Sequence, residues 1–487
     1  MLKSEVEASM YVDGKRIRSD EWVTVHNPAA LSEVVGRFPQ AAESHARDAV
    51  AAADEAFDSW KRVPVKDRGE MLITAAASLA EAAPQWHELL TRENGKVLAE
   101  SKLDFELTTM LLNYYGSHPE LLDDAVIVGD RGRTVVHKVP LGVTAAMVPW
   151  NWPPTLAALK IGPALLAGNT VVVKGPDYSS IAFLLALERV ACHFPRGVLN
   201  VLSGRGPEVG RALVTDPRVR KVAFTGGTAT GRLVAAEAAP DLKRVTLELG
   251  GNDAAVLLPD VELTEDLARH LTRDAFASSG QLCFDVKRIY APKPMLPKLI
   301  DLMSSAIDEI VVGNGLSPNV TMGPLNNERQ YESVNNLLAA TRSAGLSTRK
   351  LGTAEAGTSV EDGYFVLPHL VVDPPEEADV VRCEQFGPIL PIMAYENEIE
   401  AIQRANSSEY GLGSSIWTSD EERAYQLAHE FEAGTTFING HNLAMLDFEA
   451  PFGGFKSSGY GREVGPEGLS EYVQSHSVIG GRNLESS

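Results

Sequence analysis

The sequence predicts an α/β protein with a doubly wound parallel sheet, because short apolar runs alternate with helical stretches from residue 141 onward. Strands that alternate with helices in this way form βαβ units, and helices then cover both faces of a parallel sheet. The first series of strand candidates is VTAAMVP (143–149), NTVVVK (169–174), VLNVLSG (198–204), KVAFTGG (221–227) and RVTLELGG (244–251). The second series, which predicts a further α/β region over 252–445, is DAAVLLP, KRIYAP, FVLPHLVV, LPIMAY, SSIWT and TTFING.

The opening third is expected to begin as a helical layer. Residues 44–60 carry alanine, valine, phenylalanine and tryptophan at three-and-four spacing, which predicts an amphipathic helix that ends near Pro64. Stretches rich in alanine and leucine predict further helices around 69–82 and 99–115.

A hairpin interrupts this pattern at 123–139, where DDAVIVGDRGRTVVHKV contains a Gly-Asp-Arg-Gly turn. An exposed hairpin leaves a strand edge that needs a partner. The run EYVQSHSVI (471–479) is a candidate further strand for this sheet, and a second subunit is a candidate partner for its edge.

Length and charge limit the possible partners. A chain of 487 residues exceeds what one hydrophobic core usually serves, which favours two or three domains. The formal net charge of −21 argues against nucleic acid, because phosphate backbones are bound by basic faces. A phosphate-bearing cofactor stays possible, since main-chain N–H groups can hold phosphate.

The three cysteines, at 192, 283 and 383, are too few and too far apart to predict a disulfide framework or a metal site. They fit a reducing, cytoplasmic location. We expect no signal peptide and no membrane contact, because neither the N-terminus nor any other stretch has an apolar run of sufficient length.

One cysteine stands in an unusual context. ASSGQLCFDVKRIY places Cys283 after a polar turn that we expect to be flexible, and before a strand candidate. A free cysteine is most often a small buried apolar residue. The alternative is a nucleophile, which needs a base and an anion-stabilising donor elsewhere in the chain. Cys192 and Cys383 lack comparable surroundings and are interpreted as structural.

Candidate partners for a nucleophile follow the predicted strands, where open α/β sheets bind ligands. Asn151, in PWNWPP, is either an amide donor to an oxyanion or the residue that stabilises a local turn. Glu248, between leucines and ahead of two glycines, is either a base with a raised pKa or half of a buried salt bridge. The glycines of FTGGTATG (224–231) suit a pyrophosphate at a helix N-terminus, although neither they nor SGRGPEVG form the G-x-G-x-x-G fingerprint.

Seven motifs in order carry a family resemblance: PWNWP, VVVK, FTGG, LELGG, GQLC, EQFGP and PFGGFKSSGYGRE. This series resembles that of the NAD(P)-dependent aldehyde dehydrogenase superfamily over nearly the whole chain. The resemblance implies that Cys283 is the nucleophile and Glu248 the general base. It also implies that Asn151 and the main-chain N–H of Cys283 form the oxyanion hole.

The resemblance implies cofactor contacts as well. They are Trp150, Lys174, Asp177, Gly226, Gly227, Gly231, Gly250, Glu384 and Phe386. The implied architecture is a cofactor-binding domain (1–122 and 140–250), a catalytic domain (251–445) and a bridging β-element (123–139 and 446–487). Self-association as a dimer or tetramer is implied too.

Two departures bear on the cofactor. Lys-Gly-Pro-Asp replaces the family's Lys-Pro-Ser-Glu, and FTGG replaces FTGS. We expect NAD rather than NADP, because a carboxylate at Asp177 would repel a 2′-phosphate, although Lys174 could pair with one.

The expected substrate is an apolar aldehyde of medium size, aliphatic or aromatic. The positions that resemble the family's substrate tunnel are Trp152, Leu156, Leu159 and Phe452, with parts of the loop HNLAMLDFEA. Asp447 or Glu449 would favour a cationic aldehyde if they pointed inward. A CoA-acylating dehydrogenase, a dehydrogenase of charged semialdehydes and a non-redox thiol hydrolase are the alternative functions.

Overall fold

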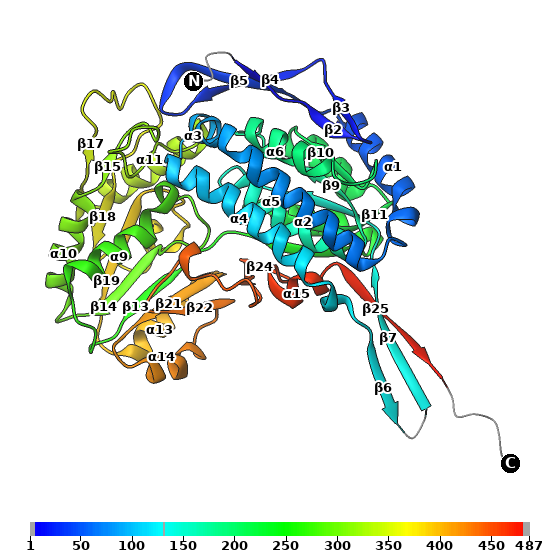
Figure 1. Ribbon diagram of the computed structural model, residues 1–487. Coiled ribbons are helices and arrows are strands. Elements are labelled where there is room, and N and C mark those ends of the chain that lie inside the picture. The colour runs from blue at the N-terminus through cyan, green and yellow to red at the C-terminus, as the bar shows by residue number, and fades with distance from the viewer. Residues whose placement is uncertain (1–4, 130–131, 481–487) are drawn as a thin grey trace.

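The computed structural model describes residues 5–129 and 132–480. Figure 1 shows a body with two sheet-containing parts and a β-arm that projects from it. One part is built on an eight-stranded sheet and the other on a seven-stranded sheet, and the arm has three strands. Among the described residues, no helix is both long enough and apolar enough to cross a membrane.

The eight-stranded sheet has the order β24-β12-β11-β8-β9-β10-β2-β3. Its five central strands are parallel. β24 (Gly459–Tyr460) and β2 (Met10–Val12) pair antiparallel to them on the two sides, and β3 (Lys15–Ile17) forms the edge beyond β2. The central strands are β8 (Val143–Met147), β9 (Thr170–Lys174), β10 (Leu199–Leu202), β11 (Val219–Thr225) and β12 (Arg244–Glu248), which confirms the first series of strand candidates.

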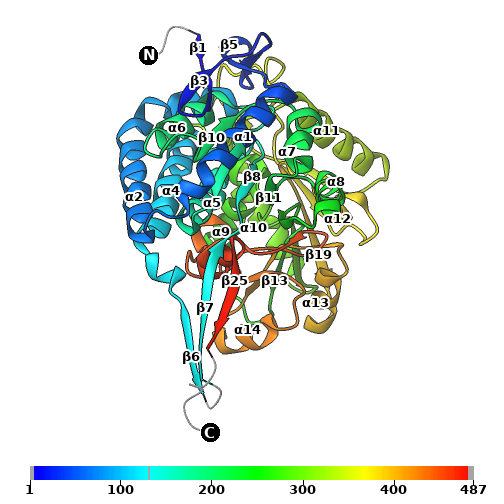
Figure 2. The same ribbon diagram turned by 90° about the vertical axis from the view of Figure 1, so that its right-hand side faces the viewer.

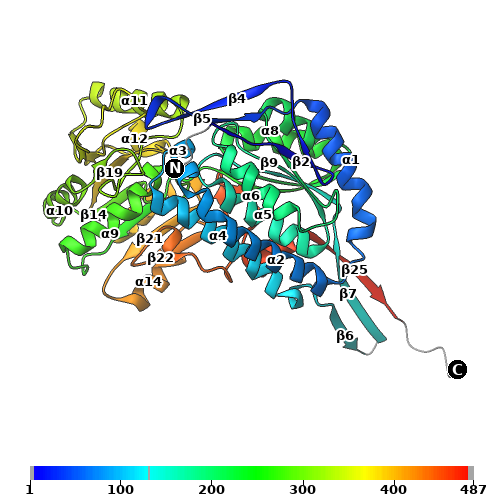
Figure 3. The same ribbon diagram turned by 45° about the horizontal axis from the view of Figure 1, so that its top comes forward.

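Helices cover both faces of this sheet, as the apolar runs predicted. Val171 and Val173 of β9 pack into one core with α2, α4, α5 and α6, while Val172 packs into another with α1, α7 and α8. Figure 3 shows the first group of helices across the near face. The helices are α1 (Glu43–Trp60), α2 (Val65–Ala82), α3 (His87–Asn94), α4 (Leu98–Ser117), α5 (Pro153–Ala167), α6 (Ile181–Ala191), α7 (Arg211–Thr215) and α8 (Thr228–Ala238).

The expectation of a helical beginning was wrong. Strands come before α1, namely β1 (Val6–Glu7), β2 (Met10–Val12), β3 (Lys15–Ile17), β4 (Trp22–Asn27) and β5 (Ala30–Pro39). Most are short, and β3 is largely exposed, so they carry little hydrophobic alternation. Their pairing is long-range: β2 joins β10, nearly two hundred residues later in the chain.

The seven-stranded sheet has the order β16-β18-β19-β14-β13-β21-β22 and is parallel except at β16. Its strands are β13 (Ala254–Leu257), β14 (Arg288–Pro292), β16 (Thr348–Lys350), β18 (His369–Val372), β19 (Ile389–Tyr395), β21 (Gly413–Trp417) and β22 (Thr435–Ile438). Its helices are α9 (Glu265–Phe276), α10 (Leu296–Asp308), α11 (Glu328–Ser343), α12 (Asp379–Arg382), α13 (Glu398–Asn406) and α14 (Glu421–Ala428). The second series of strand candidates is therefore confirmed.

The arm consists of β6 (Ala125–Gly129), β7 (Gly132–Pro140) and β25 (Val473–Ile479), all antiparallel. Figure 2 shows these strands extending away from the body. The hairpin and its C-terminal third strand are thus confirmed, while the two central residues of the predicted turn, 130 and 131, lie outside the described residues. Short elements complete the chain, namely β15 (Val311–Val312), β17 (Thr353–Ala354), β20 (Tyr410–Gly411), β23 (Phe455–Lys456), β24 (Gly459–Tyr460) and α15 (Gly465–Ser470).

The strand order places a ligand-binding crevice at one edge of the first sheet. From β8 the chain proceeds to β9 and β10 on one side, and then returns to β11 and β12 on the other. The connections therefore leave in opposite directions at β8 and β11, and such a switch point opens a crevice at the carboxyl ends of the strands. Asn151 follows β8 and Gly226 follows β11, so both lie at this crevice.

Candidate active site

Two cavities meet at Cys283. The larger, of about 370 Å³, lies between the carboxyl edge of the first sheet and the start of α11. The smaller, of about 60 Å³, is lined almost wholly by apolar side chains. Asn151, Leu156, Thr225 and Cys283 line both cavities, so a ligand in either one reaches the thiol.

The loop before Cys283 is buried and tightly held, so the expectation of a flexible polar loop was wrong. Ser278, Ser279 and Gly280 have φ angles of 49°, 62° and 73°, three consecutive left-handed conformations. Such conformations persist only where the surroundings impose them. Here the Ser278 N–H donates to Glu100 Oε1 at 2.6 Å, and Trp152 Nε1 donates to Ser278 Oγ at 3.0 Å. Contacts from the first sheet's helices therefore shape a loop of the second part.

Cys283 itself is half-buried, and its carbonyl packs against Gly251. A Cβ atom at Gly251 would lie 2.1 Å from the Cys283 oxygen, so only glycine permits this approach. Burial raises the pKa of the Cys283 thiol well above its usual range, and the nearby carboxylates of Glu384, Glu248 and Asp253 raise it further. The resting thiol is therefore protonated at neutral pH, and a reaction at sulfur needs a base.

Glu248, the last residue of β12, lines the small cavity with Cys283. Burial raises its pKa well above the usual carboxyl range, the charge of Glu463 adds to the effect, and Lys160 opposes it. Neither oxygen of Glu248 has a side-chain hydrogen-bond partner among the described residues. Lys160 instead pairs with Glu463 at 2.5 Å, so the salt-bridge interpretation of Glu248 is not what the structure shows.

Asn151 reaches across to the other sheet's loop instead of stabilising its own turn. Its Nδ2 donates to the main-chain oxygen of Gln281 at 2.9 Å, and the side chain is buried. An amide nitrogen carries two N–H donors, so one is used in this contact and the second remains available at the Cys283 end of both cavities.

Six of the nine expected cofactor contacts line the large cavity. They are Trp150, Gly226, Gly227, Gly250, Glu384 and Phe386. The environment suits a nucleotide cofactor: a Cβ atom at Gly227 would meet open space, and Glu384 Oε1 accepts from the Gly251 N–H at 3.0 Å. Burial raises the pKa of Glu384 to about 7.

Lys174, Asp177 and Gly231 do not line that cavity. The Lys174 amino group donates hydrogen bonds to Asp177 Oδ1 at 2.5 Å and to the Gly175 carbonyl. The charge of the lysine is therefore already neutralised within its own turn. Gly231 is buried in α8, where a Cβ atom would lie 2.5 Å from a methyl group of Leu249. Its observed role is close packing of the helix on the sheet.

Although sequence reasoning predicted Cys283, Glu384 and Phe386 from the second part, it missed further residues that the same part contributes to the large cavity. They are Asn327, Arg329, Gln330 and Ser333, around the start of α11, and they are joined by Tyr178 and Thr230 from the first part. The only local signal was the Asn327 N-cap, whose side chain accepts from the Gln330 N–H. Nothing in that pattern indicates which cavity the helix borders.

All four expected substrate residues, Trp152, Leu156, Leu159 and Phe452, line the small cavity. The loop expected to join them contributes Leu443, Leu446 and Phe448. Asp447 and Glu449 are exposed and lie outside the cavity lining, so they place no charge inside it.

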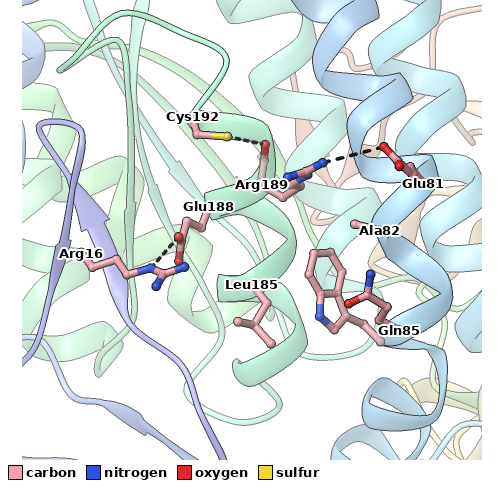
Figure 4. Close-up of a pocket in the computed structure, with 9 residues that line it drawn as sticks. Arg16, Glu81, Ala82, Gln85, Leu185, Glu188, Arg189 and Cys192 are labelled. Atoms are coloured by element: carbon pink, nitrogen blue, oxygen red, sulfur yellow. Dashed lines mark hydrogen bonds and ion pairs between the residues drawn. The ribbon is translucent and has the colours of Figure 1, made fainter.

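The other two cysteines line neither cavity, although Cys383 directly precedes Glu384. Figure 4 shows a separate cavity of about 400 Å³ next to Cys192, whose thiol donates to the Arg189 carbonyl at 3.1 Å. None of the expected site residues lines that cavity. Cys192 and Cys383 are both exposed, so neither fills a core position.

The carboxylates around Cys283 predict how a substitution changes the pH dependence of alkylation at the thiol. Replacing Glu384 by glutamine removes a negative charge that raises the pKa of Cys283, so the pKa should fall. We expect the pH profile of iodoacetamide alkylation to move to lower pH in Glu384→Gln and to stay in place in Glu422→Gln, which alters an exposed carboxylate on α14. An unchanged or alkaline-shifted profile in Glu384→Gln would show that its charge does not act on the thiol.

Comparison with known proteins agrees with this geometry. The sequence profile of the aldehyde dehydrogenase family matches residues 15–478. Geranial dehydrogenase of Castellaniella defragrans is 37% identical over 92% of this chain and 94% of its own, and glutarate-semialdehyde dehydrogenase of Pseudomonas aeruginosa is 34% identical over 95% of each. The solved structure of a Staphylococcus aureus betaine aldehyde dehydrogenase variant with NAD+ superposes with a TM-score of 0.93, at 28% identity and 98% coverage of both chains.

Proposed function

The chain belongs to the aldehyde dehydrogenase family of oxidoreductases, and we propose that it oxidises an apolar aldehyde of medium size to the carboxylic acid with NAD. The observation that carries the proposal is the meeting of two different cavities at one thiol. The large cavity holds the glycines and carboxylate expected for a nucleotide, and the small one is almost wholly apolar.

The proposed reaction begins at sulfur. Glu248 takes the thiol proton, directly or through a bridging water, and Cys283 adds to the aldehyde carbon to form a thiohemiacetal alkoxide. The free N–H of Asn151 donates to the oxygen as its charge develops, and one such donor typically contributes about 2.7–4 kcal/mol.

NAD, when bound in the large cavity, supplies the nicotinamide ring that accepts the hydride. Its fit rests on Gly226 and Gly227, which come directly before α8 and leave space at the helix's first main-chain N–H groups for a pyrophosphate, and on Glu384 for ribose hydroxyls. After hydride loss Cys283 carries a thioester. Glu248 then takes a proton from water, whose oxygen attacks the thioester and releases the acid.

The substrate proposal rests on the small cavity. Apart from Cys283, its ionisable residues are Glu248 and Glu463, and Glu463 is already paired with Lys160. Such a lining binds by burying hydrocarbon and provides no cation for a carboxylate. The geranial dehydrogenase relative supports this choice by name, whereas the glutarate-semialdehyde dehydrogenase relative supports the charged alternative.

A panel of aldehydes with NAD and without CoA tests both the proposed oxidation and the proposed apolar substrate. We expect NADH absorbance to rise, with a higher kcat/KM on apolar aliphatic or aromatic aldehydes than on acetaldehyde, because each buried CH₂ contributes about 0.8 kcal/mol. Highest activity on a carboxylate-bearing semialdehyde would contradict the apolar substrate. Activity only with CoA present would favour the acylating alternative, and ester hydrolysis without any NADH would favour the thiol hydrolase.

Self-association is proposed from the arm. Val126, Ile127 and Val128 of its edge strand β6 are 51%, 60% and 77% exposed, and an apolar strand edge is a typical surface for pairing with a second copy. A particle mass of one chain by light scattering at micromolar concentration would contradict this.

A cytoplasmic location is proposed as well, because a nucleophilic thiol must stay reduced. Cell fractionation tests this proposal.

A further inference from the structure

The two halves of the proposed oxyanion hole come from different parts of the molecule. Asn151 follows β8 of the eight-stranded sheet, whereas Cys283 precedes β14 of the seven-stranded sheet. The donor geometry therefore depends on how these two segments are held relative to each other. Neither sheet's own hydrogen bonds can set that relation.

A closed ring of hydrogen bonds joins the two segments. Gln281 Oε1 accepts from the Asn326 main-chain N–H at 3.0 Å, and Asn326 Nδ2 donates to the Asn94 carbonyl at 3.0 Å. Asn94 Nδ2 donates to the Trp150 carbonyl at 2.7 Å. Asn151, the next residue, returns to the Gln281 carbonyl at 2.9 Å, which closes the ring.

The ring is buried, and the amides of Gln281 and Asn326 are hydrogen-bonded, whereas Asn151 Oδ1 has no partner among the described residues. Gln281, Asn326 and Asn94 are 5%, 6% and 4% exposed. Gln281 Nε2 donates to the Ser278 carbonyl at 2.9 Å, and Asn326 Nδ2 also donates to Ser179 Oγ at 2.6 Å. Buried hydrogen bonds restrict the residues that they join to one arrangement, since breaking a link leaves a polar group unpaired.

We infer that Gln281, Asn326 and Asn94 are positioning residues, which hold the Asn151 amide at a set place relative to the Cys283 main chain. They line neither of the two cavities that meet at the thiol, and they act through the segments that they bridge. This inference rests on the proposed function for its biological meaning. The positioning of the Asn151 donor, however, should affect any reaction in which an oxyanion forms next to Cys283.

Two cofactor-free reactions of the same thiol separate this role from a general effect on folding. With p-nitrophenyl acetate, sulfur adds to a carbonyl, an oxyanion forms, and p-nitrophenolate leaves a thioester behind. With iodoacetamide, sulfur displaces iodide directly, and no oxyanion forms. Both reactions need the same thiolate, so the ratio of their rates reports on the oxyanion donors.

The variants are Gln281→Met and Asn326→Leu, which keep approximate size and lose the side-chain bonds. We expect the acylation rate to fall about tenfold or more, because a displacement of about 1 Å can cost about 10²-fold, while alkylation stays within about twofold. The NADH burst should slow by the same factor as acylation, with the KM for NAD changed by less than about twofold. Asn335→Leu on α11, which loses only a bond to the Tyr331 carbonyl, is the matched control and should change neither rate.

The double variant Gln281→Met with Asn326→Leu should be little worse than either single one, because links of one ring are not independent. Equal losses of acylation and alkylation in both variants would show a merely structural role, and unchanged acylation in either would also overturn the inference. Selective loss of acylation in an enzyme that makes no NADH would uphold the inference while contradicting the proposed function.

Discussion

Cys283→Ala is expected to abolish both the first burst of NADH and the steady turnover. Without sulfur at this position no thiohemiacetal can form, so no hydride can leave the substrate carbon. The large cavity should keep its shape, because the side chain loses only one atom and is half-buried. Rapid-mixing absorbance with a saturating aldehyde measures the burst, and nucleotide binding, followed by tryptophan fluorescence, should persist.

Cys192→Ala is the matched control, because its thiol is exposed and lies in a separate cavity. It should keep both the burst and the turnover. Measurable turnover by Cys283→Ala, above the level of an enzyme-free reaction, would remove the basis of the whole catalytic assignment.

Glu248→Gln is expected to keep the amplitude of the burst and to lose the steady turnover. Hydride transfer precedes thioester hydrolysis, so a defect in water activation lies after the step that produces NADH. General-base assistance typically contributes about 10²–10⁴-fold, and the steady rate should fall by that order. If Glu248 also takes the thiol proton, the burst slows but its amplitude stays.

The exposed Glu422→Gln on α14 is the control and should behave as the parent enzyme. Mass spectrometry of quenched Glu248→Gln should detect the acyl group on Cys283, because the thioester accumulates. Unimpaired turnover by this variant, where deacylation limits the parent, would assign water activation to another group.

The main elements of the fold could be predicted from local patterns. Val171, Val172 and Val173 belong to a wholly apolar run, and such a run between helices is typical of a parallel strand covered on both faces. The opening strands could not be predicted in this way. A strand such as β3, with Lys15 and Arg16 exposed, shows no alternation, and its pairing comes from distant segments.

Sequence alone determined which side chains stand at strand ends, and hence that Asn151, Glu248 and the glycines after β11 share one edge. Parallel strands point the same way, so this placement follows from local order. Only the tertiary structure decided that Gly231 serves packing and that α11 borders the large cavity. It alone also brought Asn94, Asn326 and Gln281 into one ring. The physical reason is that the α11 and ring contacts depend on how the two sheets pack against each other, and the Gly231 contact on how α8 packs on its own sheet. Periodicity along the chain carries no information about either kind of packing.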